Sequence, residues 1–389
     1  MTTNLHTKRP RIIALDLIRG LFLLIILADH LAWTPSLFLQ SITAYTGMIA
    51  SAAEGFFVIS GILVGYIYGP KILAYPKKTT VKLLRRGLVL YTLAVVFTLF
   101  YTTWAYFLPD GYPRSSVVIA ETINNALTGA LTLTYTFGWA DFLGRYAIFM
   151  TLAPLALWLI ATRKSYIVLI ISGLVWLLLR EAPPFATFTA WQIIFFSGII
   201  IGYYLPKIEN FAIATEYRKQ ILLSLTMLSL VSFVLAIIFV AAPPLLLLSF
   251  DTVINTNVTD TLIRINGLRE SILLYFDKST MSILRLIIGA LWFSGLYYIF
   301  RRYEATINKY SCGILLTLGQ YSLFVYSIQA LLIFTIDTIF TPPSYPNPSL
   351  ILLNTFIGIL CATITYLATL LYAKRITIYT KIKHLRAIK

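Results

Sequence analysis

Long apolar segments, separated by shorter polar stretches, follow one another along almost the whole chain. A helix needs about 20 apolar residues to cross the hydrocarbon core of a bilayer. Ten segments reach or approach that length, the fifth and sixth being short: residues 12–33, 46–69, 87–108, 141–161, 166–180, 189–206, 221–243, 281–300, 311–336 and 349–373. The pattern predicts an all-α polytopic membrane protein with about ten transmembrane helices.

The basic residues between these segments predict the orientation of the chain. Cytoplasmic loops of membrane proteins carry an excess of Lys and Arg. With a cytoplasmic N-terminus, 23 of the 31 basic residues fall in inner stretches, including the basic tail 374–389, and five fall in outer ones. We therefore expect both termini in the cytoplasm and a single membrane domain over residues 1–389.

Two further stretches are expected to be outer loops. Residues 115–137 are moderately apolar, but polar residues such as Glu121 interrupt them, and counting them as a span would move Arg163 to the outer side. Residues 244–280 carry seven charged side chains. Loops of this length in compact proteins usually bind something.

Composition supports a membrane protein and argues against a nucleic-acid partner. Hydrophobic residues make up 59% of the 389 residues and charged residues 12%, against about 25% charged residues in soluble domains. The net charge of +16 gathers in the stretches between apolar segments, where topology and anionic lipid account for it. The expected partner is the lipid bilayer.

The first apolar segment contains charged residues that need an explanation. Asp16, Arg19, Asp29 and His30 interrupt it, although each central charge in a bilayer costs a few kcal/mol. On an α-helix Arg19 and His30 lie within about 20° of each other, so the polar stripe must face protein or water. Histidine suits proton transfer at neutral pH. The structural alternative is an ion pair between Asp16 and Arg19, with His30 among lipid headgroups.

More polar residues gather in the outer half of the predicted membrane region. They come from five different segments: Glu54, Asp141 and Arg145, Gln192, Arg285, and Gln329. Together with His30 they predict a cavity that holds a base, carboxylates and cations and opens to the outer loops. Glu54, Asp141 and Arg285 also have a structural alternative, as interhelical tethers or interfacial anchors.

Five short motifs occur in order between residue 11 and about residue 330. Their residues are Asp16, Arg19, Gly20 and His30; Ala52, Ala53, Glu54, Phe56, Ser60 and Gly61; Ala190, Trp191, Gln192, Phe195, Phe196 and Gly198; Asp277, Lys278 and Arg285; and Gly319, Ser322, Leu323 and Val325. The pattern resembles the OpgC family of bacterial inner-membrane acyltransferases, which succinylate osmoregulated periplasmic glucans. The chain departs from the family pattern at Asp29, Ser51 and Arg145, where the family commonly has Asn, Asp and an apolar residue.

The resemblance implies transfer of an acyl group from cytosolic acyl-CoA, either succinyl-CoA or acetyl-CoA, to a sugar hydroxyl of a glucan or other glycan outside the inner membrane. It implies no metal. His30 would be the general base, with Asp29 or Glu54 orienting the imidazole. Arg285 or Arg145 would stabilise the oxyanion or hold a succinyl carboxylate. Asp141 lies four residues before Arg145 and could pair with its guanidinium. This favours Arg285 as the residue that holds the succinyl carboxylate.

The remaining candidate residues are assigned to binding. Substrate-binding candidates are Asp16, Arg19, Asp141, Arg145, Gln192, Asp277, Lys278 and Arg285. The basic loop 71–86 suits the phosphates of CoA through Lys78, Lys82, Arg85 and Arg86. The same loop is equally explained as a topology signal or a lipid-binding surface.

Other functions remain open at this stage. An O-acetyltransferase of a cell-surface polysaccharide is the nearest alternative. A membrane transporter is an alternative of another class, but the sequence shows neither the paired repeats nor the broken helices that are common in transporters. A sensor or structural membrane protein explains the one-sided polar cluster least well. The sequence leaves the glycan, the oligomeric state and the order of chemical steps undetermined.

Overall fold

The computed structural model describes residues 9–33, 35–38, 48–108, 112–113, 119–243, 256–340 and 348–387. These residues form helices and no strand, which confirms the all-α prediction. Contacts divide the chain into two compact units, each assembled from three segments: unit 1 comprises Met1–Arg11, Ala53–Leu225 and Ile272–Ala290, and unit 2 comprises Ile12–Ala52, Thr226–Ser271 and Leu291–Lys389. We describe each unit by itself.

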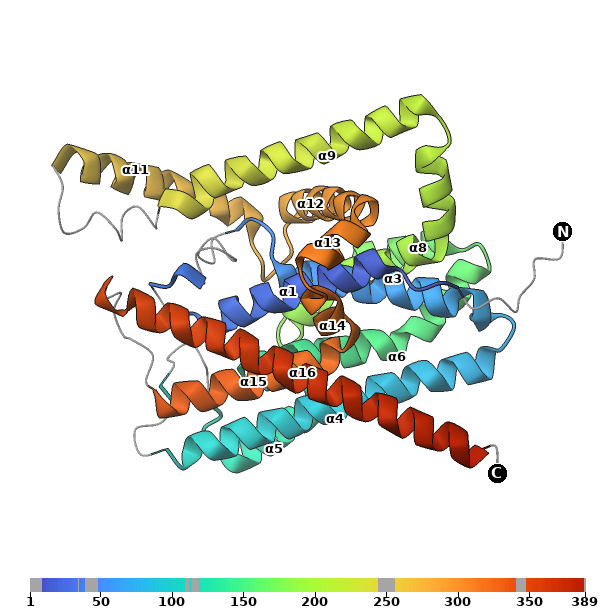
Figure 1. The fold of residues 1–389 in the computed structure, drawn as a ribbon, viewed down its shortest axis with the longest axis horizontal. Coiled ribbons are helices and arrows are strands. Elements are labelled where there is room, and N and C mark those ends of the chain that lie inside the picture. Colours follow the sequence, from blue (N-terminus) through green and yellow to red (C-terminus); the bar gives the residue numbers. More distant parts are fainter. Residues whose placement is uncertain are drawn as a thin grey trace. The chain divides into compact units, whose positions relative to one another are not determined.

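Unit 1 contains most of the predicted polar cluster. Its helices are α3 (Ala52–Ile72), α4 (Pro76–Tyr106), α5 (Ile123–Thr132), α6 (Asp141–Ala161), α7 (Ser165–Leu179) and α8 (Ala186–Ile213), with the short helix η1 (Gly138–Ala140) before α6 and η3 (Leu274–Phe276) (Figure 1). Unit 1 also includes the beginnings of α9 (Glu216–Ala236) and α12 (Ile283–Arg302).

Glycines bring α3 and α8 into close contact. Gly61 and Gly65 are four residues apart, and a Cβ added at either would collide with backbone carbonyls of α8. Gly202 of α8 likewise faces the carbonyl of Ile62. Small residues at a spacing of four allow helix backbones to approach closely in a membrane. This packing explains why two of the five motifs end in glycine, at Gly61 and Gly198, which also oppose each other.

Unit 2 is built around α1 (Ile13–Leu31). Its other helices are α11 (Thr256–Leu273), which ends just beyond the unit, α13 (Glu304–Tyr310), α14 (Ile314–Gln320), α15 (Ser322–Ile339) and α16 (Ile351–Ala387), with η2 (Ile237–Ala241) and η4 (Pro348–Leu350). Helices α1 and α14 approach each other as closely as α3 and α8 do. A Cβ added at Gly20 would meet the backbone of Leu315, and one at Gly319 the carbonyl of Asp16.

The direction of these helices bears on the number of membrane crossings. In unit 1, α3 and α8 run parallel, because Gly61 lies at Phe195 and Gly65 at Ile199. Two parallel spans must be separated by an odd number of crossings. Helices α4, α6 and α7 lie between them, so α7 must cross although it has only 15 residues.

The helix directions in unit 2 also agree with the expected number of membrane crossings. Contacts of the first span with α15 rise together, from Leu23 and Gln329 to Trp33, just after α1, and Asp337, so α1 and α15 are also parallel. The short α14 meets α1 in the opposite order, with Gly20 at Leu315 and Asp16 at Gly319. Seven expected spans lie between the first and the ninth, which is the odd number required. Eight described helices are long and apolar enough to cross a membrane; α1, with three charged residues, and the short α7 complete the ten. The protein is a polytopic membrane protein.

Three expectations about local structure need correction. The expected span 87–108 begins earlier, at Pro76 of the 31-residue α4, so most of the basic loop 71–86 is helical. The expected span 311–336 is broken at Tyr321, which separates α14 from α15. The expected tail 374–389 continues α16 to Ala387, and residues 388–389 lie outside the described chain.

The two expected outer loops contain helices but no long apolar span in their described parts. α5 has ten residues, too few to cross a bilayer, while α11 has 18 residues and includes Arg264, Arg269 and Glu270. Residues 114–118 and 244–255 lie outside the described chain.

The sidedness of the membrane remains a prediction. A reporter fused after Lys389 should be cytoplasmic, because ten crossings return the chain to its starting side. A cysteine introduced near Thr256 should react with an impermeant reagent added from outside. A matching cysteine in the 301–310 connection should be protected in intact cells, and external labelling there would contradict the ten-span topology.

Candidate functional site

Glu54 and Arg285 form a buried ion pair in unit 1. Glu54 lies in the first turn of α3, and Arg285 lies in the first turn of α12. The Nε and Nη2 atoms of Arg285 both approach Glu54 Oε1, at 2.8 and 2.6 Å, and the two side chains are 5% and 9% exposed. Nη1 donates to the carbonyl of Phe276 at 2.9 Å. The guanidinium therefore joins two helix starts and the end of η3.

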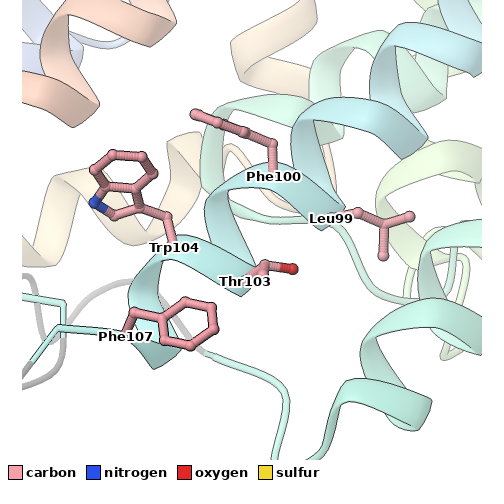
Figure 2. Close-up of a pocket in the computed structure, with 5 residues that line it drawn as sticks. All are labelled: Leu99, Phe100, Thr103, Trp104 and Phe107. Carbon is pink, nitrogen blue, oxygen red and sulfur yellow. The ribbon is translucent and has the colours of Figure 1, made fainter.

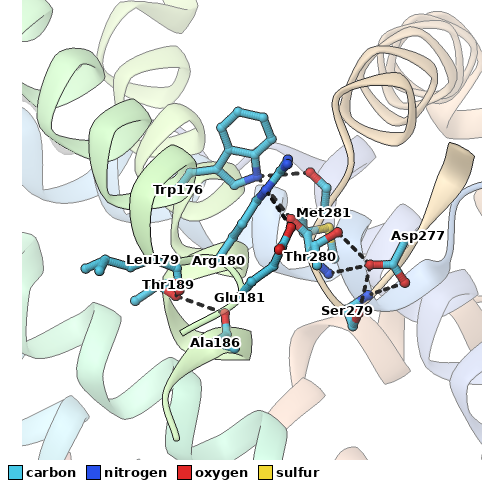
Figure 3. A network of polar contacts seen from close by, with 10 residues as sticks. All are labelled: Trp176, Leu179, Arg180, Glu181, Ala186, Thr189, Asp277, Ser279, Thr280 and Met281. Carbon is cyan, nitrogen blue, oxygen red and sulfur yellow. Dashed lines mark hydrogen bonds and ion pairs between the residues drawn. The ribbon is translucent and has the colours of Figure 1, made fainter. Parts of the chain in front are cut away.

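The chain just before α12 is fixed by a second set of hydrogen bonds. Asp277 accepts four of them, from the backbone N–H and hydroxyl groups of Ser279 and Thr280, at 2.5–3.2 Å. Trp176 of α7 donates its indole N–H to the carbonyls of Thr280 and Met281, at 3.2 and 3.0 Å (Figure 3). These contacts hold the turn that delivers Arg285 to Glu54.

The electrostatics of Asp277 agree with a structural role in this turn. Burial by itself raises the pKa of Asp277, but the hydrogen bonds from Thr280 and Ser279 outweigh it and lower that pKa to about 2. Because the folded-state pKa lies below the ordinary value of 3.8, the carboxylate stabilises the turn above that pH and loses the effect as the pH falls toward 2. Lys278, beside it, is exposed.

Arg145 and Asp141 pair with each other on α6, as their i,i+4 spacing predicts. Arg145 is buried, whereas the Asp141 side chain is 47% exposed. The Arg145 guanidinium carbon lies 4.6 Å from the ring centroid of Trp191, a cation–π arrangement. Arg145 Nε is buried and has no hydrogen-bond partner among the described residues. This arginine is thus only partly satisfied by protein groups.

Gln192 connects α7 to α8. Its Oε1 accepts from the Ser172 hydroxyl at 2.6 Å, and its Nε2 donates to the carbonyls of Ser172 and Thr189, at 2.7 and 3.2 Å. Both ends of the carboxamide are engaged in protein contacts. The structure therefore gives Gln192 an interhelical role, and its assignment to substrate binding remains a prediction.

The polar stripe of the first span lies in unit 2. Asp16 is 4% exposed, while Arg19, Asp29 and His30 are partly exposed. The His30 imidazole meets the ring of Tyr326 of α15 edge-on, with ring centroids 6.3 Å apart. His30 occupies the last turn of α1, which ends at Leu31. Its partial exposure is what a base that receives a substrate proton requires.

Asp337 is a buried carboxylate that the sequence reasoning missed. It is 1% exposed, and its Oδ1 accepts the indole N–H of Trp33 at 3.0 Å. Trp33 follows the left-handed residue Ala32, which ends α1 just after His30. The expected span stopped at residue 336, so Asp337 was counted outside the membrane; a single Asp among the apolar residues 331–340 was the available signal.

The candidate CoA-binding residues lie on α4 in unit 1. Lys78, Lys82, Arg85 and Arg86 are exposed, and they lie in the first turns of the helix. Lys82 follows Lys78 by four residues, and Arg85 and Arg86 follow Lys82 by three and four, so the four side chains share one face. Arg86 donates to the hydroxyl of Tyr68 at 3.3 Å. The four cations therefore form a helical basic face, which we call the α4 basic face.

A shallow apolar hollow lies near the end of the same helix. It has a volume of about 430 Å³ and is lined by Leu99, Phe100, Thr103, Trp104 and Phe107 (Figure 2). None of these five side chains is charged or a general base. Such a surface suits contact with lipid chains, so the hollow adds nothing to the candidate site.

The predicted residues thus fall into groups within each unit. Unit 1 joins Glu54 to Arg285 and Asp141 to Arg145. Unit 2 holds His30 and Asp29 at the end of α1 and contains Asp16 and Arg19 on the same helix. The i,i+4 pair was recognisable from sequence, whereas the partners Glu54 and Arg285 are 231 residues apart.

Comparison with known proteins supports the resemblance seen in the motifs. No curated protein and no solved structure matches the chain. The family model described as OpgC protein matches residues 11–376, nearly the whole chain. Membership of this family indicates a membrane acyltransferase that acts on glucans. The chain belongs to the OpgC family.

Proposed function

We propose that this protein transfers a succinyl group from cytosolic succinyl-CoA to a sugar hydroxyl of a glucan on the outer side of the bacterial inner membrane. The family match over residues 11–376 carries the proposal. An imidazole in a membrane helix, buried arginines and an exposed basic helix face supply the chemical groups that the reaction needs. Another glycan is the alternative acceptor, and acetyl-CoA is the alternative donor within the same reaction class.

His30 is the proposed general base. An alcohol is a weak nucleophile, so a positioned base must accept its proton as the oxygen attacks the thioester carbonyl. The C–O bond forms, the C–S bond breaks, and the proton held by His30 is passed to the departing CoA thiolate. Asp29 is the better candidate to stabilise the imidazolium, because the Glu54 carboxylate already pairs with Arg285.

Arg145 is the better candidate to bind the carboxylate of a succinyl group. Both buried arginines of unit 1 already have a carboxylate partner. Asp141, the partner of Arg145, is 47% exposed and can turn toward water, whereas Glu54 is 9% exposed. Arg145 also has a free Nε among the described residues. These differences reverse the preference for Arg285 drawn from the sequence.

Replacing Arg145 by leucine should reduce succinyl transfer far more than acetyl transfer. Only the succinyl group carries a carboxylate, and a charge-assisted hydrogen bond contributes about 1.5–3 kcal/mol, or about 10- to 150-fold in kcat/KM. The measurement is kcat/KM with each donor. Arg180→Leu is the matched control, since Arg180 also stacks on a tryptophan but is more exposed. Equal losses with both donors would exclude carboxylate recognition by Arg145.

The α4 basic face is proposed to bind the phosphates of CoA. Its exposed ammonium and guanidinium groups can contact phosphate oxygens without breaking a buried ion pair. Anionic lipid headgroups have related chemistry, so competition between CoA and anionic lipid in vesicles distinguishes the two roles.

Transfer of a labelled acyl group tests the reaction class directly. Purified protein in vesicles should move label from succinyl-CoA to a soluble glucan, and a transporter would move a solute without forming an ester. The break at Tyr321 removes one sequence argument against a transporter, but the family match favours the acyltransferase. Absence of label in the glucan with either donor would refute the proposed function.

A further inference from the structure

Gln329 presents a buried acceptor on the face of α15 that contacts α1. It is 2% exposed, and its Nε2 donates to the carbonyl of Leu23 at 3.2 Å. Its Oε1 is also buried and has no hydrogen-bond partner among the described residues. Since the Leu23 carbonyl can pair only with a donor, this bond fixes the orientation of the carboxamide and leaves Oε1 as the unused atom.

The surroundings of Gln329 connect it with the proposed base. Tyr326 lies three residues earlier on α15, and its ring contacts His30. Side chains three residues apart on a helix are neighbours, with Cβ atoms about 5–6 Å apart. The unused acceptor therefore lies about one helical turn from the aromatic group that touches His30. All of these residues belong to unit 2.

Buried polar atoms in proteins are nearly always hydrogen-bonded, so an oriented acceptor without a partner needs an explanation. Gln192 offers a comparison within the same chain, because both ends of its buried carboxamide are engaged by protein groups. Gln329 has the same side chain and similar burial, yet only one end is used. The difference points to a group that is supplied from outside the protein.

We propose that Gln329 Oε1 binds an uncharged hydrogen-bond donor of a substrate during acyl transfer. A neutral carboxamide oxygen accepts an O–H or N–H group, and it does not neutralise a buried cation. A sugar hydroxyl of the acceptor and an amide N–H of the acyl-CoA arm share this chemistry. The inference rests on the proposed function and adds a binding residue in the same unit as the proposed base.

Steady-state kinetics with each substrate varied in turn test the inference. In the purified protein, Gln329→Met should raise the KM of one substrate about three- to tenfold. This is the change in binding expected when one neutral hydrogen bond is lost. A raised KM for glucan identifies a sugar hydroxyl as the hydrogen-bond donor to Gln329. A raised KM for acyl-CoA identifies an amide N–H of the acyl-CoA arm as that donor.

Thr369→Val is the matched control. Thr369 is fully buried in α16 of the same unit, and its hydroxyl donates to the carbonyl of Thr365. This variant should leave both KM values unchanged. If Gln329→Met lowers the melting temperature but also leaves both KM values unchanged, Gln329 is purely structural or binds only water, and the inference is overturned.

A ligand-binding measurement separates this inference from the proposed function. If the wild type transfers no acyl group to glucan, the proposed function fails, and thermal shifts induced by CoA and by the glucan are compared. A shift in the wild type that Gln329→Met loses supports a binding role for Gln329. Equal shifts in both proteins, or none in either, overturn it.

Discussion

Replacing His30 by alanine is expected to slow acyl transfer to glucan by 10²–10⁴-fold, the usual contribution of a general base. His30 occupies the last turn of α1, is partly exposed and contacts Tyr326 edge-on. These features allow a substrate hydroxyl to reach an imidazole whose ring position is supported by a neighbour. The initial rate of label transfer from acyl-CoA to glucan is the measurement.

The control for His30 must separate catalysis from folding. Tyr326→Phe keeps the aromatic ring beside His30 and should retain most of the activity, whereas His30→Ala should insert into the membrane and melt like the wild type. Turnover near the wild-type rate in purified His30→Ala would rule out His30 as the base. A folded but inactive His30→Gln would show that hydrogen bonding alone does not replace proton transfer.

The helices of this protein were predictable from sequence because a membrane span needs a continuous apolar segment, and that segment is local information. The pairing of Asp141 with Arg145 was predictable for the same reason, since four residues are about one helical turn. The break at Tyr321 was not, because the Gly319, Gln320 and Ser322 that flank it also occur inside continuous membrane helices. Tertiary packing decided that boundary.

The partners of the buried polar residues were less predictable. No local rule connects Trp33 to Asp337 or Gln329 to the Leu23 carbonyl, both of which join segments about 300 residues apart. Sequence reasoning recognised that a charge in a span needs a partner, and this correctly singled out Glu54 and Arg285. It could not say that they pair with each other, so the structural alternative for both residues was left open.

The pairing of Glu54 with Arg285 predicts a large effect on stability. Removing one member of a buried ion pair leaves an uncompensated charge and costs about 3–5 kcal/mol. Arg285→Leu and Glu54→Leu should therefore each lower the melting temperature of the purified protein markedly. The double variant should be more stable than either single variant, because an apolar pair leaves no buried charge.

The exposed ion pair of Arg301 and Glu304 is the matched control for these Glu54 and Arg285 variants. Its side chains are 45% and 29% exposed, and such pairs contribute about 0–1 kcal/mol, so Glu304→Leu should change the melting temperature little. If Arg285 serves stability, as its contacts with Glu54 and Phe276 indicate, Arg285→Leu should reduce succinyl and acetyl transfer equally. A stable Arg285→Leu variant that selectively lost succinyl transfer would instead make Arg285, and not Arg145, the residue that recognises the acyl carboxylate.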